Sequence, residues 1–257
     1  MIAVLLIVTA FSATPYNDTF DKALQAYESA DYATAVVLYE QLVAEGVVAP
    51  ELFYNLGNAY MQQNRPGPAL ANFERALRLD PALAHAKQNR QLCIQQTQAK
   101  NMPPAPPVWE QNLLFWHFGI SLRGAVYAFT AAWFALWGLL ALRSWRPFPL
   151  FKSGLAIATL TLCLMAMSVY AKIAAPVLAV VSSPTVAVRY TADLDEGVRF
   201  ELVEGDTVVV DAEEGEWYRI AAGDGNRGWL PRSDVTLVGP PYQAAPEPRG
   251  PGPEKAT

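Results

Sequence analysis

Two uncharged stretches, residues 124–142 and 153–171, constrain the fold of this chain more than any other feature. Each is 19 residues long, which makes about 28 Å of α-helix, while the hydrocarbon core of a bilayer is about 30 Å thick. Two buried core helices of this kind would need a large protein around them, and a chain of 257 residues does not provide one. We therefore predict two membrane-spanning helices in a multi-domain membrane protein.

The charges beside these stretches predict how the two helices cross the membrane. The loop between them, residues 143–152, carries Arg143, Arg146 and Lys152 and no acid. Basic loops are retained in the cytoplasm. We therefore expect a cytoplasmic loop, with both outer flanks of the hairpin on the opposite side.

The N-terminal run, residues 2–11, is apolar but too short to cross a bilayer. Small residues follow it, so the pattern is typical of a secretory signal peptide, which we predict at residues 1–12. No Lys or Arg precedes the run, and the alternatives are an uncleaved anchor or a wrongly assigned start codon. A cleaved signal peptide predicts the same topology as the loop charges.

Residues 16–49 and 50–83 are two copies of a 34-residue period. The second copy has the residue spacing of a tetratricopeptide repeat (TPR), a pair of antiparallel helices. We expect Gly57 to be small because the two helices touch there, and Gly67 to serve the turn between them. A polar helix over residues 82–99 would cap the array. The matching positions of the second copy are Phe53, Leu56, Gly57, Tyr60, Ala69, Phe73, Ala76 and Pro81.

The first helix of each repeat lines a concave face in such arrays, which is commonly a peptide groove. We expect the asparagines of this face to hydrogen-bond a partner's backbone and the apolar residues of the first copy to form the floor. The alternative is that these side chains pack against the capping helix or face solvent. The predicted protein-binding residues of the helical domain, residues 16–99, are Phe20, Leu24, Tyr27, Tyr54, Asn55, Asn58 and Gln62.

From residue 184 to residue 238 the pattern changes to five or six short strands separated by turns. So many short strands in one segment predict a small all-β barrel. Residues 186–238 carry 12 acids and 5 bases, and the resulting net charge of −7 would favour a basic partner.

Four motifs in this segment resemble those of bacterial SH3-like domains. They are V-x-V-R at residues 186–189, E-G-D at 204–206, G-E-W-Y-R-I at 215–220 and G-x-x-G-W-L-P at 225–231. The resemblance implies an SH3-like barrel that binds cell-wall peptides or proteins, with Trp217 and Tyr218 lining a ligand groove. The alternative is that Trp217 is a half-buried residue of the barrel.

Two segments are expected to lack a packed core of their own. Residues 100–123 form a Pro-rich linker and an interfacial segment, where Trp109 and Trp116 suit the membrane–water boundary. The tail, residues 239–257, is rich in proline and is predicted to be disordered.

The chain offers little material for catalysis or metal binding. Cys93, Cys163, His85 and His117 are too few and too widely spaced for a structural zinc site. No phosphate-binding, dinucleotide-binding or nucleophile motif occurs, and neither end has the basic surplus that nucleic acid requires. We therefore expect a non-enzymatic protein with no cofactor, metal ion or nucleic-acid partner.

The order of the parts resembles the BatE-type proteins of bacterial aerotolerance operons: signal peptide, TPR pair, two-span hairpin and SH3-like domain. The resemblance implies an inner-membrane scaffold with periplasmic domains. It also implies partners among membrane proteins with von Willebrand A domains and, indirectly, a MoxR-type ATPase. The alternative function is a peptidoglycan-binding protein of the cell wall that recruits a hydrolase through its repeats.

Overall fold

A computed structural model describes residues 16–97, 99–102, 107–145, 151–193, 197–240 and 242–243. The chain divides into two compact units. The first unit contains the described parts of residues 1–76, 84–103 and 177–257, and the second contains those of residues 77–83 and 104–176. The predicted signal peptide, residues 1–12, lies outside the described residues.

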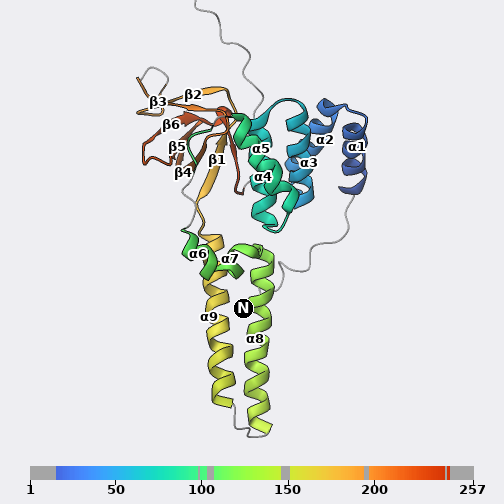
Figure 1. Ribbon diagram of the computed structural model, residues 1–257, viewed down its shortest axis with the longest axis vertical. Helices are drawn as coiled ribbons and strands as arrows, with labels where there is room; N and C mark the ends of the chain where they lie inside the picture. The colour runs from blue at the N-terminus through green and yellow to red at the C-terminus, as the bar shows by residue number, and fades with distance from the viewer. Residues whose placement is uncertain are drawn as a thin grey trace, which may run out of the picture. The chain divides into compact units, whose positions relative to one another are not determined.

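Five helices occupy the N-terminal part of the first unit (Figure 1). Proline begins two of them, at the first helical position, where its missing N–H costs no hydrogen bond. Asp31 caps another, since its Oδ1 accepts a hydrogen bond from the Thr34 amide at 3.1 Å. The helices are α1 (Tyr16–Glu28), α2 (Tyr32–Ala44), α3 (Pro50–Gln62), α4 (Pro66–Leu79) and α5 (Ala84–Thr97).

The backbone itself repeats with the predicted period. Ala30, between α1 and α2, has a φ of 62°, and Asn64, between α3 and α4, has a φ of 57°. These left-handed residues are unusual for non-glycine side chains, and they lie 34 positions apart. The two helix pairs therefore turn in the same way at equivalent positions of the two copies.

Helices α3 and α4 pack against each other at Gly57, as predicted. A Cβ atom added there would lie 2.8 Å from Cε1 of Phe73, which is closer than real Cβ atoms come. Leu56, Phe73 and Ala69 are completely buried in this pair. The interpretation of Gly57 as a contact glycine is confirmed, and α4 ends at Leu79, two residues before Pro81.

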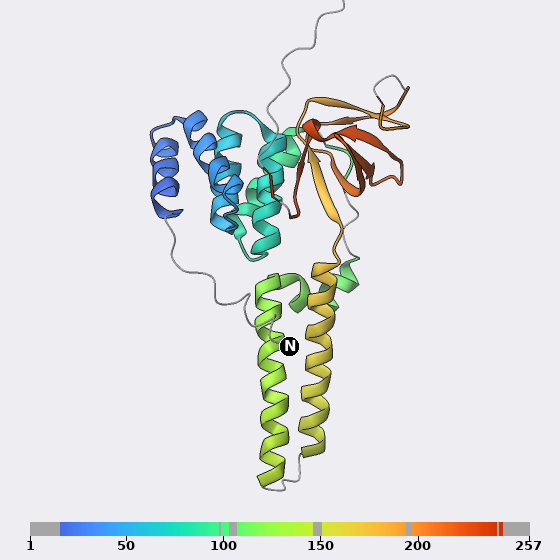
Figure 2. The same cartoon turned by 180° about the vertical axis from the view of Figure 1, so that it is seen from behind.

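The C-terminal part of the first unit is one antiparallel seven-stranded sheet in the order β3-β2-β6-β5-β4-β1-β7. Figure 2 shows these strands from behind, in orange and red. Side chains from all seven strands meet in a single core that includes Val181, Val188, Leu202, Ile220 and Leu230. The strands are β1 (Val177–Val181), β2 (Thr185–Arg189), β3 (Val198–Val203), β4 (Thr207–Glu214), β5 (Trp217–Ala221), β6 (Arg227–Pro231) and β7 (Val235–Leu237).

Two features of the sheet differ from the prediction. Strand β1 lies before residue 184, and it pairs with both β4 and β7, so the sheet begins one strand earlier than expected. Within the described strands, β3 and β7 each pair with one neighbour, and the sheet does not close into a barrel. The β character of the segment is confirmed, its described strands form an open sheet, and the resemblance to bacterial SH3-like domains remains a prediction.

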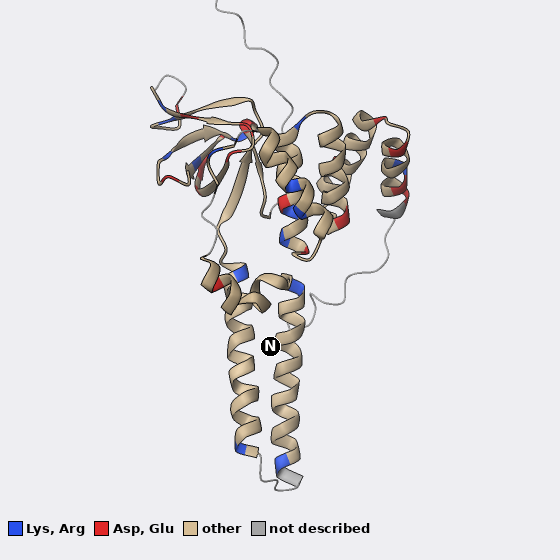
Figure 3. Cartoon of the chain, in the orientation of Figure 1, with Lys and Arg blue, Asp and Glu red and all other residues tan. Residues whose placement is uncertain are grey.

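The second unit contains two long helices, α8 (Leu122–Trp145) and α9 (Phe151–Ile173), which include the two predicted spans. Both are long and apolar enough to cross a membrane, and few of their residues are buried. They pack closely at Gly154, where an added Cβ would lie 3.5 Å from Cδ2 of Leu139. Figure 3 shows both helices without acidic or basic residues between their ends. Two short helices, α6 (Val108–Leu113) and α7 (Phe115–Gly119), precede them.

The start of the predicted disordered tail is packed against the helical repeat. Gly239 is buried, and the ring of Tyr242 lies 4.9 Å from that of Phe53 on α3. The prediction of disorder from residue 239 is therefore wrong for the first residues of the tail, because Tyr242 has an apolar surface to cover. The rest of the tail, from residue 244, lies outside the described residues.

Candidate functional site

The predicted groove residues of the first repeat pack mainly against their own helix pair. The ring of Phe20 meets that of Tyr39 edge-on, with centroids 5.6 Å apart, and Tyr27 meets Tyr32 in the same way at 5.3 Å. Leu24 is half-buried. These contacts hold α1 on α2, so the aromatic side chains contribute to the packing of the repeat as well as to the surface of α1.

The groove residues of the second repeat fall into two groups. Tyr54 lies beside Phe73 of α4, with ring centroids 6.0 Å apart, and Asn58 Oδ1 accepts a hydrogen bond of 2.8 Å from Asn89 Nδ2 of α5. For Asn58 the structure thus agrees with the alternative, in which the side chain packs against the capping helix. Asn55 is half-buried and Gln62 is exposed, and neither amide has a hydrogen-bond partner among the described residues.

Trp217 and Tyr218 do not lie on one surface of the sheet. Successive residues of a strand point to opposite faces, and Tyr218 is only 3% exposed, within the core of the sheet. The guanidinium of Arg232 covers its ring at 4.7 Å. Trp217 is half-buried, so of the two aromatic residues it is the one that a ligand could reach.

The helical repeat and the sheet are joined through a buried arginine that the sequence analysis did not identify. Arg75 of α4 is completely buried. Its Nε donates to the carbonyl oxygen of Leu237 at 2.8 Å, its Nη2 to that of Gln243 at 2.7 Å, and its Nη1 to Asn72 Oδ1 at 3.1 Å. Burial lowers the pKa of Arg75 to about 10, which still leaves the group charged at neutral pH.

Asp206 forms a second connection between the two parts. This buried residue follows β3, and its Oδ1 accepts hydrogen bonds of 2.8 Å from the amides of both Lys100 and Asn101. The Thr207 amide in turn donates to the carbonyl oxygen of Asn101 at 2.8 Å. Lys100 and Asn101, at the start of the predicted linker, are therefore bonded to Asp206 and to the first residue of β4.

Glu204 forms the third connection, at the N-terminus of α4. Its Oε1 accepts a hydrogen bond of 2.8 Å from the Gly67 amide, and so caps a helix that begins 138 positions earlier in the chain. A Cβ on Gly67 would lie 2.7 Å from both the Val181 carbonyl oxygen and Glu204 Cγ. Gly67 is thus the second residue of α4, and it allows the sheet to approach rather than serving the turn as predicted.

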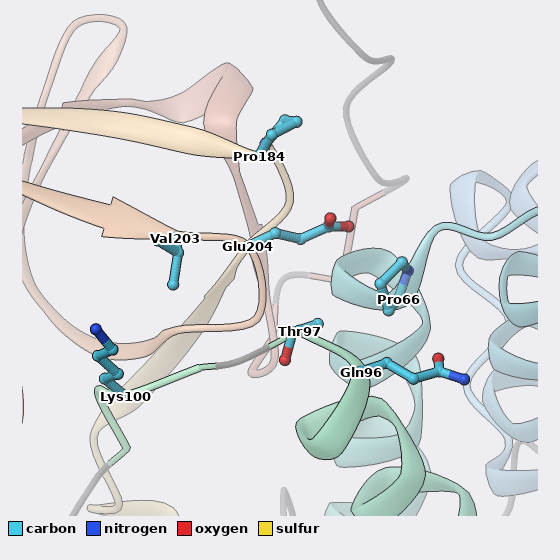
Figure 4. A pocket seen from close by; sticks show the side chains of 7 residues that line it. All are labelled: Pro66, Gln96, Thr97, Lys100, Pro184, Val203 and Glu204. Atoms are coloured by element: carbon cyan, nitrogen blue, oxygen red, sulfur yellow. The ribbon is translucent and has the colours of Figure 1, made fainter.

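A cavity of about 310 Å³ lies beside this third connection. Residues of the helical part and of the sheet line it together, and Figure 4 shows Glu204 reaching from the sheet side towards Pro66 at the start of α4. Burial raises the pKa of Glu204, although the Gly67 hydrogen bond and the charge of Arg65 oppose this change. The cavity belongs entirely to the first unit.

In the second unit a polar cluster fixes the short helix α7 to the end of α9. His117 Nδ1 lies 2.7 Å from Ser168 Oγ, and Lys172 Nζ donates to the carbonyl oxygen of His117 at 2.8 Å. Burial and the positive charge of Lys172 lower the pKa of His117, which favours a neutral imidazole. Among the described residues, no three His, Cys, Asp or Glu side chains are arranged as ligands for a metal ion.

The tetratricopeptide repeat family matches residues 50–83, the segment that forms α3 and α4. This segment is therefore a TPR, and repeats of this class indicate a role in protein–protein interaction. No curated protein matches the chain. The first copy, residues 16–49, is supported by its helix pair and by its left-handed residue at the equivalent position.

Proposed function

We propose that this protein is a membrane-anchored, non-enzymatic scaffold that binds other proteins on the extracytoplasmic side. The observation that carries the proposal is that the segments before and after the hairpin form one unit containing a TPR. Arg75, Asp206 and Glu204 tie the two segments together. An interaction surface joined at both ends to a pair of membrane-length helices is suited to holding partners at a membrane.

The same observation supports the proposed topology. A unit built from both flanks of a hairpin requires both flanks on one side of the membrane, which an even number of spans provides. The basic loop then favours the cytoplasm for the other end of the hairpin. The first unit would accordingly be periplasmic in a bacterium with an outer membrane.

The short helices α6 and α7 support anchoring at the membrane surface. Val108, Trp109, Leu113 and Phe115 are each at least 65% exposed, which is unfavourable for large apolar side chains in water. Tryptophan and other aromatic side chains are enriched at membrane–water interfaces. The bond between His117 and Ser168 holds this aromatic segment at the end of α9.

The order of the parts supports a more specific role. In the arrangement of the BatE-type proteins, the TPR and the sheet would dock membrane proteins that carry von Willebrand A domains. A MoxR-type ATPase in the cytoplasm would then be reached through these membrane-crossing partners. The alternative, a cell-wall binding protein, would use the sheet to hold peptidoglycan through Trp217.

The test is an affinity purification of the full chain from detergent-solubilised membranes, with identification of the proteins that co-purify. The groove variant Asn55→Ala with Gln62→Ala changes two side chains that hold no hydrogen bond among the described residues, unlike Asn58. The matched control is Thr34→Ala with Gln41→Ala, two exposed positions on α2, the second helix of its repeat.

The proposal predicts that membrane proteins co-purify with the wild type and the control, and that the groove variant loses most of them. Equal recovery with all three proteins would contradict the groove. Recovery of cell-wall fragments and hydrolases alone, lost on Trp217→Ala, would support the alternative function instead.

A further inference from the structure

A hollow on the surface of α9 begins near the loop between the two long helices. Its volume is about 540 Å³, which lies within the range of small-molecule pockets, about 300 to 1,000 Å³. All of its lining residues belong to α9, so the hollow lies entirely within the second unit. The lining residues are Lys152, Leu155, Ala156, Thr159, Leu160 and Cys163.

The spacing of these residues shows that the hollow is a groove along the helix. Its floor consists of residues that recur at intervals of four, three and four positions, which lie on one face of an α-helix. Leu155 and Leu160 fall on the two sides of this strip and form the walls of the groove. The floor residues are Lys152, Ala156, Thr159 and Cys163.

The length of the groove matches one leaflet of a bilayer. From Lys152 to Cys163 the helix rises about 16 Å, and one leaflet contributes about 15 Å to the hydrocarbon core. Met167 and Tyr170 occupy the next two positions of the same strip, and they are 71% and 73% exposed. A helix that followed the strip across the bilayer would meet these large side chains, whereas an acyl chain needs only the length of one leaflet.

The loop end of the groove is positively charged. Lys152 is exposed there, and the guanidinium carbon of Arg143 lies 5.4 Å from the ring centre of the adjacent Phe151. The sequence contains no acidic residue between Glu110 and Asp193, so the hairpin itself offers Lys152 no carboxylate. Figure 3 shows basic residues at the loop ends of both helices. A second copy of the hairpin would add like charges at this end, whereas an anionic group would neutralise them.

We propose that the groove binds an anionic phospholipid of the leaflet on the loop side. The phosphate accepts charge-assisted hydrogen bonds from the ammonium of Lys152, and one acyl chain lies between Leu155 and Leu160. A loop in the cytoplasm would place the site in the leaflet that carries the negative surface potential. The inference rests on the proposed membrane anchoring but not on the protein partners, so a failed lipid titration and a failed partner purification are distinguishable results.

The experiment measures lipid binding to the full chain in a neutral detergent by native mass spectrometry. The probes are dioleoyl-phosphatidylglycerol, which is anionic, and dioleoyl-phosphatidylcholine, which has the same acyl chains and no net charge. We expect the wild type to bind phosphatidylglycerol at least about tenfold more tightly, because its phosphate carries a charge that no group of the lipid neutralises.

Lys152→Met tests the contact with the headgroup. The variant removes the charge and keeps an unbranched side chain, so binding of phosphatidylglycerol should weaken about tenfold while binding of phosphatidylcholine stays unchanged. The matched control is Arg123→Met, which removes an exposed positive charge at the opposite end of the hairpin and should keep the preference.

Ala156→Leu with Thr159→Leu tests the contact with the acyl chain. The larger side chains fill the floor of the groove, so the variant should bind both lipids about fivefold more weakly than the wild type does. The matched control is Thr161→Leu with Ala166→Leu, two exposed positions of α9 that do not line the groove.

The proposal is overturned if the wild type binds the two lipids equally, or if Lys152→Met keeps the preference for phosphatidylglycerol. It is also overturned if the filled groove binds both lipids as the wild type does. If filling the groove breaks a dimer of the chain and leaves lipid binding unchanged, the strip is a contact between helices and not a lipid site.

Discussion

The helices of the two units have the same backbone geometry and opposite surroundings. In the TPR, Leu56, Phe53 and Phe73 are completely buried by neighbouring helices of the same protein. In the hairpin, Phe134 on α8 is 66% exposed and Leu160 on α9 is 61% exposed. The first unit buries these side chains within its own core, whereas the hairpin leaves such side chains exposed. The predictions below test this contrast from the largest expected effect to the smallest.

The largest effect is expected at Arg75, where the first unit depends on a buried charge. Arg75→Ala removes a fully buried side chain and leaves the carbonyl oxygens of Leu237 and Gln243 without their donor. We expect the free energy of unfolding to fall by about 3–5 kcal/mol, measured by chemical denaturation in detergent with tryptophan fluorescence. The control Arg78→Ala, on the same helix but half-exposed, should cost less than about 1 kcal/mol. Equal losses would contradict the role of Arg75.

One substitution made in both units compares their surroundings directly. Leu56→Ala should cost the first unit about 2–5 kcal/mol because it opens a cavity between packed helices. Leu160→Ala should leave that free energy of unfolding unchanged, since its side chain is exposed on α9 of the second unit. Denaturation curves of the two variants provide the measurement, and a large loss for Leu160→Ala would show that the hairpin is packed like a soluble core.

Glycine positions provide a third comparison. Gly67→Ala should destabilise the first unit by about 1–3 kcal/mol, because the added methyl group would collide with the Val181 carbonyl oxygen and with Glu204. Gly138→Ala in α8 has open space around the added Cβ and should be tolerated. Thermal unfolding monitored by tryptophan fluorescence measures both variants. A tolerated Gly67→Ala would mean that the sheet does not approach α4 this closely.

The smallest effect is a dependence of stability on pH. Burial raises the pKa of Glu204 above its ordinary value of 4.5, so the folded state binds a proton more readily than the unfolded state does. The contribution of this group is therefore most favourable below pH 4.5 and is lost as the pH rises through the folded pKa. Because Glu204→Gln has no carboxyl group to titrate at this position, the stability of this variant should not show that decline. Melting temperatures of both proteins from pH 4 to pH 7 provide the test, and parallel curves would contradict the assignment.

Local patterns in the sequence predict much of this fold. The uncharged stretches at residues 124–142 and 153–171 lie within α8 and α9, because hydrophobic length is a property of consecutive residues. The contact at Gly57 follows from repeat spacing for the same reason. Strand β1 was not predicted because Val177–Val181 is apolar without alternation and comes shortly after the apolar helix α9. Such a run fits a strand at the centre of a sheet as well as a connecting segment.

The junction between repeat and sheet could not be predicted from the sequence. Arg75 and Leu237 are 162 positions apart, and nothing in the helical pattern around Arg75 distinguishes it from a surface arginine. The E-G-D motif contains both Glu204 and Asp206, but as a local signal it indicates only a turn between strands. Of the groove residues, Asn55 and Gln62 remain predictions, and Asn58 is engaged by Asn89.

The measurement that tests the central claim most directly is the accessibility of engineered cysteines in spheroplasts of a bacterial host. Ala33→Cys on α2, Glu216→Cys beside β5 and Lys152→Cys near the loop are all exposed positions. They would be made in a Cys163→Ala background. The remaining Cys93 is buried, and burial raises its pKa to about 12, so it should not react.

A maleimide that cannot cross the membrane is added before or after the membrane is opened. One extracytoplasmic unit predicts labelling at positions 33 and 216 in intact spheroplasts, and labelling at position 152 only after opening. If positions 33 and 216 were labelled from opposite sides, the segments flanking the hairpin could not form one unit in the cell.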